Sequence, residues 1–206
     1  MAKFSFTRLT ARGALIALVA AAAACSPKQV NRIDPAAVTD LSGRWNDTDS
    51  RLVANELIKQ SLDGPWLKRF SDSHGGAAPT VLVGGFSNKT YEHIAVGTFL
   101  NDLERAFTNS GAVQVMAGGT ARDQIRDERA DQQTNANAAT RAKLANETGA
   151  RYMLQGEIQA IEDSEGKEKV VFYQIDATMV DMESNAKVWI GQHKIKKYVL
   201  RKRVGL

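Results

Sequence analysis

The chain has 206 residues, of which 43% are hydrophobic, so it is long enough for one ordinary domain with an extension and can bury a core. Its formal charge of +4 is concentrated at the N-terminal end, where Lys3, Arg8 and Arg12 occur without an acidic neighbour. Subtracting these three from the 27 basic residues leaves 24 against 23 acidic ones. This balance argues against a nucleic-acid-binding protein, which would show a clustered positive excess.

Residues 1–24 have the features of a secretory signal peptide, with a basic start followed by the apolar stretch GALIALVAAAAA. That stretch is too short to span about 30 Å of hydrocarbon as a helix. It ends at Cys25, the only cysteine, which cannot form an internal disulfide. The sequence AAAC resembles the lipobox of bacterial lipoproteins, although Leu is more usual where Ala22 stands, and Ser26 in place of Asp resembles an outer-membrane address. We therefore expect Cys25 to be the lipid attachment site; an ordinary signal peptide with an incidental cysteine is the alternative.

Residues 25–40 are expected to form the lipidated cysteine and a flexible tether, because they contain two of the four prolines and show no helical or strand periodicity. If extended, such a segment would reach about 45–50 Å. The remaining residues, 41–206, are expected to form one globular domain.

A helix is predicted from about residue 48 to residue 62. Its N-cap candidates are Thr48, Asp49 and Ser50, and Gly64-Pro65 ends it. Its apolar residues recur at helical spacing: Leu52, Val53, Leu57, Ile58 and Leu62. This stripe, with Trp45 and Trp66 near its ends, should lie on a sheet, and residues 71–79 should form a flexible connection.

Residues 80–116 predict a strand, a helix and a second strand in succession. TVLVGGF has the pattern of a buried strand, Val96 to Phe107 that of a helix closed by Gly111, and AVQVM that of another strand. So short a succession indicates a right-handed βαβ unit. Residues 120–133 and 137–150 predict two further helices rich in Ala, Arg and Glu, the second ending at Gly149.

The last third of the sequence predicts an antiparallel meander. Period-two alternation marks residues 151–161, 169–182 and 187–200. Between them, Gly166 and Asn185 can take the positive φ that hairpin turns need. The expected fold class is α/β (mixed α+β): a single domain with a mixed four- to five-stranded sheet ending in an antiparallel meander, flanked by about four helices.

No cluster of residues predicts chemistry. A metal site needs three or four clustered ligands, and His74, His93 and His193 lie far apart on different predicted elements. The glycines of VGGF and AGGT do not form a phosphate-binding motif. The nucleophile motif S-x-x-K occurs at residues 164–167 and 184–187, but in predicted turns, where the two side chains need not converge. We therefore expect no catalytic residue, no metal and no cofactor.

Several blocks in order resemble the penicillin-binding protein activator LpoB family: FSNKTYEHI, LERAFTNSGAVQVM, GARYMLQGEI and KVVFYQIDATMVDMESNAKVWIGQHKIKKYV. The likeness extends over about residues 41–200. Members of that family are outer-membrane lipoproteins that bind and stimulate a bifunctional class A penicillin-binding protein, the enzyme that polymerises and cross-links peptidoglycan. The resemblance implies an activator and not an enzyme, with the periplasmic domain of such a synthase as its partner.

The tether departs from the long proline-rich linker best known in that family. A segment of this length reaches less far across the periplasm. Either the partner synthase extends further outward, the envelope gap is narrower, or the globular domain meets a different partner.

Two groups of polar residues are candidate contact surfaces. Asn88, Lys89, Tyr91 and Glu92 follow the first strand and cannot all point inward. In the alternative interpretation, Asn88 and Thr90 make turn hydrogen bonds while Tyr91 packs under the helix. The second group is a basic edge or tail: Lys194, Lys196, Lys197, Arg201, Lys202 and Arg203. Such charges often only discourage edge-to-edge strand pairing, but they can also steer an acidic partner.

The sequence therefore predicts a non-enzymatic regulator, anchored by lipid to the periplasmic face of the outer membrane, that activates peptidoglycan synthesis by a class A penicillin-binding protein. The alternative is a structural lipoprotein of envelope or surface-fibre assembly. A binder of small molecules or glycans ranks third, because the sequence shows no aromatic platform. Neither a small-molecule ligand nor nucleic acid is expected as a partner.

Overall fold

The computed structural model describes residues 29–142 and 147–200, and the chain divides into two compact units, Met1–Ala37 and Val38–Leu206. The predicted signal peptide, Cys25 and the basic residues after Leu200 lie outside the described residues. In the first unit, residues 29–37 contain no helix or strand. Among the described residues, none of the helices combines the length and the apolar character that a membrane span requires. All helices and strands named below belong to the second unit.

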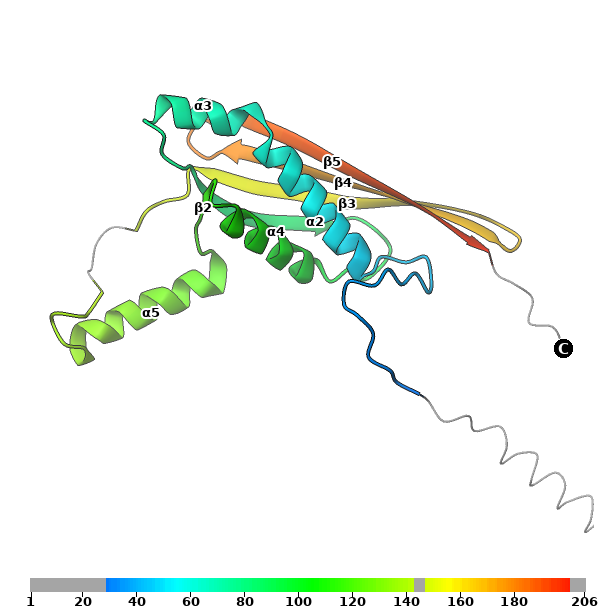
Figure 1. Ribbon diagram of the computed structural model, residues 1–206, viewed down its shortest axis with the longest axis horizontal. Coiled ribbons are helices and arrows are strands. Elements are labelled where there is room, and N and C mark those ends of the chain that lie inside the picture. The colour runs from blue at the N-terminus through cyan, green and yellow to red at the C-terminus, as the bar shows by residue number, and fades with distance from the viewer. Residues whose placement is uncertain (1–28, 143–146, 201–206) are drawn as a thin grey trace, which may run out of the picture. The chain divides into compact units, whose positions relative to one another are not determined.

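A mixed five-stranded sheet forms the body of the second unit (Figure 1). Its strands stand in the order β2 (Gln114–Val115), β1 (Thr80–Asn88), β3 (Tyr152–Glu165), β4 (Glu168–Asp181) and β5 (Lys187–Leu200). β1 is parallel to both β2 and β3, whereas β3, β4 and β5 form an antiparallel meander. The expected fold class is confirmed, including the parallel strands on either side of a helix and the meander that follows.

Both predicted hairpin turns are confirmed. Gly166 and Asn185 have φ values of 58° and 59°, the left-handed conformation that these turns require. The β4–β5 turn is also held by Asp181, whose carboxylate accepts hydrogen bonds from two backbone N–H groups of the turn (2.9 and 3.0 Å) and from Arg151 Nε (2.9 Å). Burial opposes the charge on Asp181, but these hydrogen bonds outweigh it and hold its pKa below the usual value.

The predicted N-cap candidates Thr48, Asp49 and Ser50 lie within the helix α2 (Asp47–Leu62), so that assignment is wrong. The N-cap of α2 is Asn46, whose side chain accepts a hydrogen bond from the N–H of Asp49. The Asp49 carboxylate accepts one in return from the N–H of Asn46, which completes a capping box. Most of the predicted apolar stripe is buried, with Val53 0% and Leu57 1% exposed, but Leu52 is 48% exposed and its assignment to the buried face is wrong.

Gly64-Pro65 ends α2, as predicted, but it also starts a further helix, α3 (Pro65–Ser73). The expected flexible connection over residues 71–79 is therefore wrong for its first three residues. Proline is favoured at the first helical position, because the N–H it lacks would have no intrahelical partner there. Trp66 then anchors α3, with its ring edge-on to Tyr152 at a centroid distance of 5.2 Å.

Of the two predicted Ala-rich helices, the first is present as α5 (Gly119–Asn135). The second, predicted for residues 137–150, is wrong: residues 137–142 contain a turn, and residues 147–150 are not helical. The carbonyl and side-chain oxygens of Asn137 accept the N–H groups of the next residues and close that turn. None of residues 137–142 is buried, and helix propensity alone, a few tenths of a kcal/mol per residue, does not fix a helix without a packed face.

α2 and α4 (Val96–Ser110) pack side by side against one face of the sheet (Figure 1). Every second residue of β4 faces these helices and is at most 2% exposed: Val171, Tyr173, Ile175, Ala177 and Met179. From α4, Phe99, Leu103 and Phe107 are completely buried. We call the opposite face of β3, β4 and β5 the open face; Ile161 and Ile190 there are 67% and 64% exposed. The two-residue period of the strands decides which side chains each face presents.

Candidate partner-binding surface

The loop that joins β1 to α4, residues 88–93, is called the contact loop below. Asn88 closes it: its Nδ2 donates to the carbonyl of Glu92 (2.7 Å), and its Oδ1 accepts from the N–H (2.9 Å) and the hydroxyl (2.8 Å) of Thr90. The Thr90 hydroxyl in turn accepts from the N–H of Glu92 (3.1 Å). The backbone N–H of Lys89 donates to the carbonyl of Ile158 on β3 (2.8 Å). Side chains and sheet together therefore fix the backbone of the loop.

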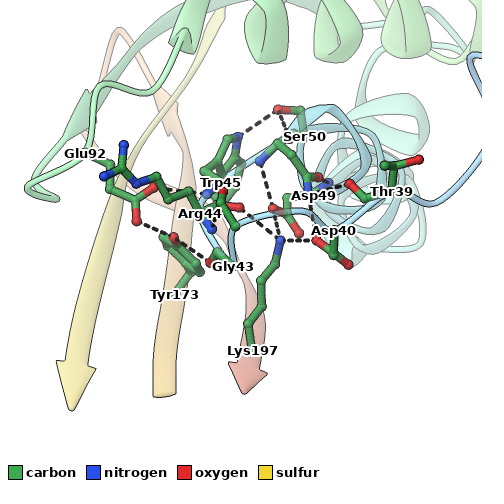
Figure 2. Close-up of polar contacts among 12 residues, drawn as sticks. Thr39, Asp40, Gly43, Arg44, Trp45, Asp49, Ser50, Glu92, Tyr173 and Lys197 are labelled. Carbon is green, nitrogen blue, oxygen red and sulfur yellow. Dashed lines mark hydrogen bonds and ion pairs between the residues drawn. The ribbon is translucent and has the colours of Figure 1, made fainter. Parts of the chain in front are cut away.

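Glu92 points inward and connects the contact loop to two other segments (Figure 2). Its carboxylate accepts hydrogen bonds from the hydroxyl of Tyr173 on β4 (2.7 Å) and from the backbone N–H of Trp45 (3.0 Å). The rings of Trp45 and Tyr173 meet edge-on at 5.6 Å. Burial of the Tyr173 side chain and its hydrogen bond to Glu92 raise the pKa of the Tyr173 phenol. Glu92 thus holds the loop in place and does not present its carboxylate outward.

Tyr91 projects from the contact loop into solvent. Its relative exposure is 104%, and the Lys89 and His93 side chains beside it are also exposed. The alternative in which Tyr91 packs under the helix is therefore wrong; Ile94, 6% exposed, enters the core instead. The turn hydrogen bonds of Asn88 and Thr90 in that alternative are nevertheless present. The contact loop thus combines a fixed backbone with one fully exposed aromatic ring.

A shallow cavity of about 270 Å³ lies beside the contact loop, between the first turns of α2 and α4. Its lining includes Trp45, Asn46, His93 and Thr98. His93 was not among the predicted contact residues, since its position beside this cavity depends on how α2 and α4 pack together.

The three lysines predicted as one basic edge do not share a surface. Lys194 and Lys196 are exposed on the open face of β5, whereas the Lys197 side chain is only 10% exposed and lies on the face toward α2. The alternation that placed Trp189 and Ile195 toward the core also assigns Lys197 to that side. The strand period was the signal that could have separated these lysines.

Lys197 connects the segment before α2 to the sheet (Figure 2). Its ammonium lies 2.7 Å from Asp40 Oδ1 and 2.6 Å from Asp49 Oδ2, and it donates to the carbonyl of Arg44 (3.1 Å). Burial disfavours the charge on Lys197, but the hydrogen bonds to both carboxylates outweigh it and raise its pKa. Hydrogen bonds from Lys197 and Asn46 lower the pKa of Asp40. With both carboxylates engaged, Lys197 has a structural role at this position.

The described residues contain no group of three or more His, Cys, Asp and Glu side chains that could hold a metal ion. In the second S-x-x-K segment, the Ser184 hydroxyl accepts a hydrogen bond from the N–H of Ala186 within the β4–β5 turn. The serine is thereby used to shape a turn, which agrees with the structural interpretation of that motif.

The family model of the peptidoglycan-synthase activator LpoB matches residues 49–195. A comparison with curated proteins found no match. Among solved structures, the LpoB C-terminal domain from Salmonella enterica is 14% identical, with a TM-score of 0.32, over 65% of this chain and 94% of that one. The NMR structure of E. coli LpoB is 13% identical, with a TM-score of 0.36, over 86% and 80%. Lipoprotein GNA1162 from Neisseria meningitidis is 12% identical, with a TM-score of 0.35, over 62% and 88%.

The family model extends from the first turn of α2 into β5, which is more than half of the chain and includes the contact loop. The family resemblance seen in the sequence is thereby confirmed. The chain belongs to the LpoB family of peptidoglycan-synthase activators.

Proposed function

We propose that this protein is a lipid-anchored regulator at the periplasmic face of the outer membrane, which binds and activates a bifunctional class A penicillin-binding protein. The observation that carries the proposal is the family match over residues 49–195. The sequence around Cys25 supports lipid attachment to that cysteine and the outer-membrane address. Several acyl chains on one residue make a durable anchor, at about 0.8 kcal/mol per buried CH₂.

The contact loop supports a role in protein binding. Lys89 and Tyr91 are the exposed members of the predicted contact set there, with His93 beside them, while Asn88 and Glu92 hold the loop. Tyrosine is enriched among the few interface residues that carry most binding energy. Because the loop is already ordered, its docking loses little conformational entropy.

Activation requires that the protein bind the active conformer of the synthase more tightly than the inactive one. A difference of about 1.4 kcal/mol in binding free energy changes the ratio of the two conformers tenfold. The activator needs no reactive group of its own for this effect.

The test uses the soluble chain from Ser26 onward, which contains the whole compact unit Val38–Leu206. It is added to purified class A synthases of the same organism, and glycan polymerisation, cross-linking and complex formation are measured. Stimulation with a stable complex is expected. Unchanged rates without a complex refute the proposal, and recovery of assembly proteins alone from solubilised membranes favours a structural lipoprotein instead.

A pair of variants tests the contact loop. Tyr91→Ala should weaken the complex at least about tenfold, since truncating a central aromatic anchor typically costs about 2 kcal/mol or more. The melting temperature should not change, because the side chain touches no core residue. Ile190→Ala on the open face, 64% exposed, is the matched control and should bind normally. Equal binding by both variants excludes the loop from the interface.

The anchor is tested separately in living cells. Cys25→Ser should abolish incorporation of labelled palmitate and move the protein from the membrane fraction to the soluble periplasm. Palmitate labelling that survives this substitution contradicts the assignment of Cys25.

A further inference from the structure

β5 is an edge strand: it pairs with β4 and with no other strand of the sheet. Figure 1 shows its C-terminal part continuing beyond α2. In an edge strand, every second residue directs its backbone N–H and C=O away from the sheet, where another extended chain can pair with them.

A glutamine side chain already occupies one position on this edge. Gln60 of α2 accepts a hydrogen bond from the N–H of Gln192 at its Oε1 (3.2 Å) and donates one from its Nε2 to the C=O of the same residue (3.2 Å). The side-chain amide of Gln60 therefore forms the same two hydrogen bonds with the backbone of Gln192 that a peptide group of a neighbouring strand would form. Gln192 thus identifies which backbone groups of β5 face outward.

Further along β5 the outward backbone groups have no partner among the described residues. The β4–β5 register is unbroken from residue 190 to residue 200, so the outward direction recurs at every second position. These positions are Lys194, Lys196, Tyr198 and Leu200. No described residue forms a hydrogen bond with their outward backbone groups, and their side chains are exposed.

The charge along this edge is positive at Lys194 and Lys196, whereas further along the Tyr198 hydroxyl donates to the Glu168 carboxylate of β4 (2.8 Å). β5 contains no acidic residue. Lys194 and Lys196 form no ion pair with any residue that the structure describes, in contrast to Lys197. The residues directly opposite them on β4 are Gln174 and Phe172, which carry no charge, and the nearby Asp176 carboxylate is engaged by Gln174 and Gln192. Two uncompensated ammonium groups therefore stand beside the outward backbone groups.

We infer that residues 194–200 of β5 accept an extended acidic segment of a partner protein as an added strand. Side chains in the added strand alternate between faces, so acidic residues at every second position lie beside Lys194 and Lys196. Main-chain hydrogen bonds supply affinity, and the lysines select the charge of the segment. A second copy of this chain fits poorly, because antiparallel pairing about Lys196 brings lysines of both edges together.

This surface is separate from the contact loop, and the inference holds whichever protein supplies the segment. The probe is a synthetic heptapeptide of alternating Val and Glu, acetylated and amidated at its ends, added to the soluble chain from Ser26 onward. At saturation, amide exchange at Lys194, Lys196 and Tyr198 should slow about tenfold, because these N–H groups gain acceptors. The amides of Ile195 and Lys197 already face β4 and should not change.

Two control peptides separate backbone pairing from charge attraction. The first control is the Val-Glu peptide N-methylated at every residue, which keeps its charges but donates no backbone hydrogen bond. The second is a peptide of alternating Val and Lys, which keeps the backbone but reverses the charge. Neither control peptide should bind. In the protein, Lys194→Glu with Lys196→Glu should weaken binding of the Val-Glu peptide at least about tenfold. Lys59→Glu with Lys187→Glu, which makes the same charge change at exposed positions outside residues 194–200, should not.

Equal binding of the N-methylated peptide, slowed exchange at other residues, or no binding at millimolar peptide overturns the inference. A dimer in sedimentation experiments, with the edge amides already protected in the absence of peptide, also overturns it, since a second copy then occupies the edge.

Discussion

Replacing Lys197 by Met removes the ammonium that joins two carboxylates while keeping most of the side-chain packing. The Asp49 side chain is 5% exposed and loses a partner 2.6 Å away, whereas Asp40 is 48% exposed and regains water. Leaving one charge of a buried pair without its partner costs about 3–5 kcal/mol. Asp49 keeps the hydrogen bond from the N–H of Asn46 (2.9 Å). We therefore expect the free energy of unfolding to fall by about 3 kcal/mol, the lower limit of this range.

The assay is urea unfolding at neutral pH, followed by circular dichroism and tryptophan fluorescence. Lys196→Met is the matched control: the adjacent residue on the same strand points to the open face, and its substitution should change stability by less than about 0.5 kcal/mol. Adding Asp49→Asn to Lys197→Met should recover part of the loss, because the buried carboxylate is then neutral. If Lys196→Met and Lys197→Met cost the same, the structural role assigned to Lys197 is refuted.

Three further outcomes can be measured with the same unfolding assay. Tyr173→Phe removes the hydroxyl that donates to the contact-loop carboxylate and should cost about 2 kcal/mol, since that hydrogen bond has a charged acceptor. Gly156→Ala places a Cβ against the backbone of β4 and should cost about 2 kcal/mol, whereas Gly85→Ala, with no atom within 4 Å, should cost far less. The folded structure lowers the pKa values of Asp40 and Asp181 below their ordinary value of 3.8, so the unfolded chain takes up protons first as the pH falls. The free energy of unfolding should therefore decrease as the pH drops below about 3.8. A flat stability profile from pH 5 to pH 2 contradicts this.

The sheet was predictable because one face of it is buried. A strand with one buried face shows its period in the sequence, and the apolar alternation of β4 marks the residues that face the helices. Gly111, in the left-handed conformation, ends α4 where the sequence indicated, and Gly166 and Asn185 form the predicted turns. At these positions local conformation and long-range packing favour the same structure.

The errors occurred where a local signal had two meanings or no packing to support it. Pro65 fits the end of one helix and the start of the next, and only the contact of Trp66 with the sheet decides for α3. Residues 137–142 have a helical composition but bury nothing, so the side chain of Asn137 determines their conformation. Lys197 was grouped with its neighbours by sequence proximity, although the partners that define its role lie more than a hundred residues away.

In the contact loop, the residues that order the backbone are distinct from Tyr91, which we propose binds the partner. Glu92 accepts hydrogen bonds from β4 and from the segment before α2, and Asn88 bonds across the loop, so its backbone is ordered by folding. Conformational entropy lost at folding is not lost again at association. Tyr91 makes none of these hydrogen bonds, and the apolar surface of its ring is fully exposed to water in the isolated protein. The binding energy of this site should therefore reside in Tyr91 and its immediate neighbours, while Asn88 and Glu92 set the position from which it acts.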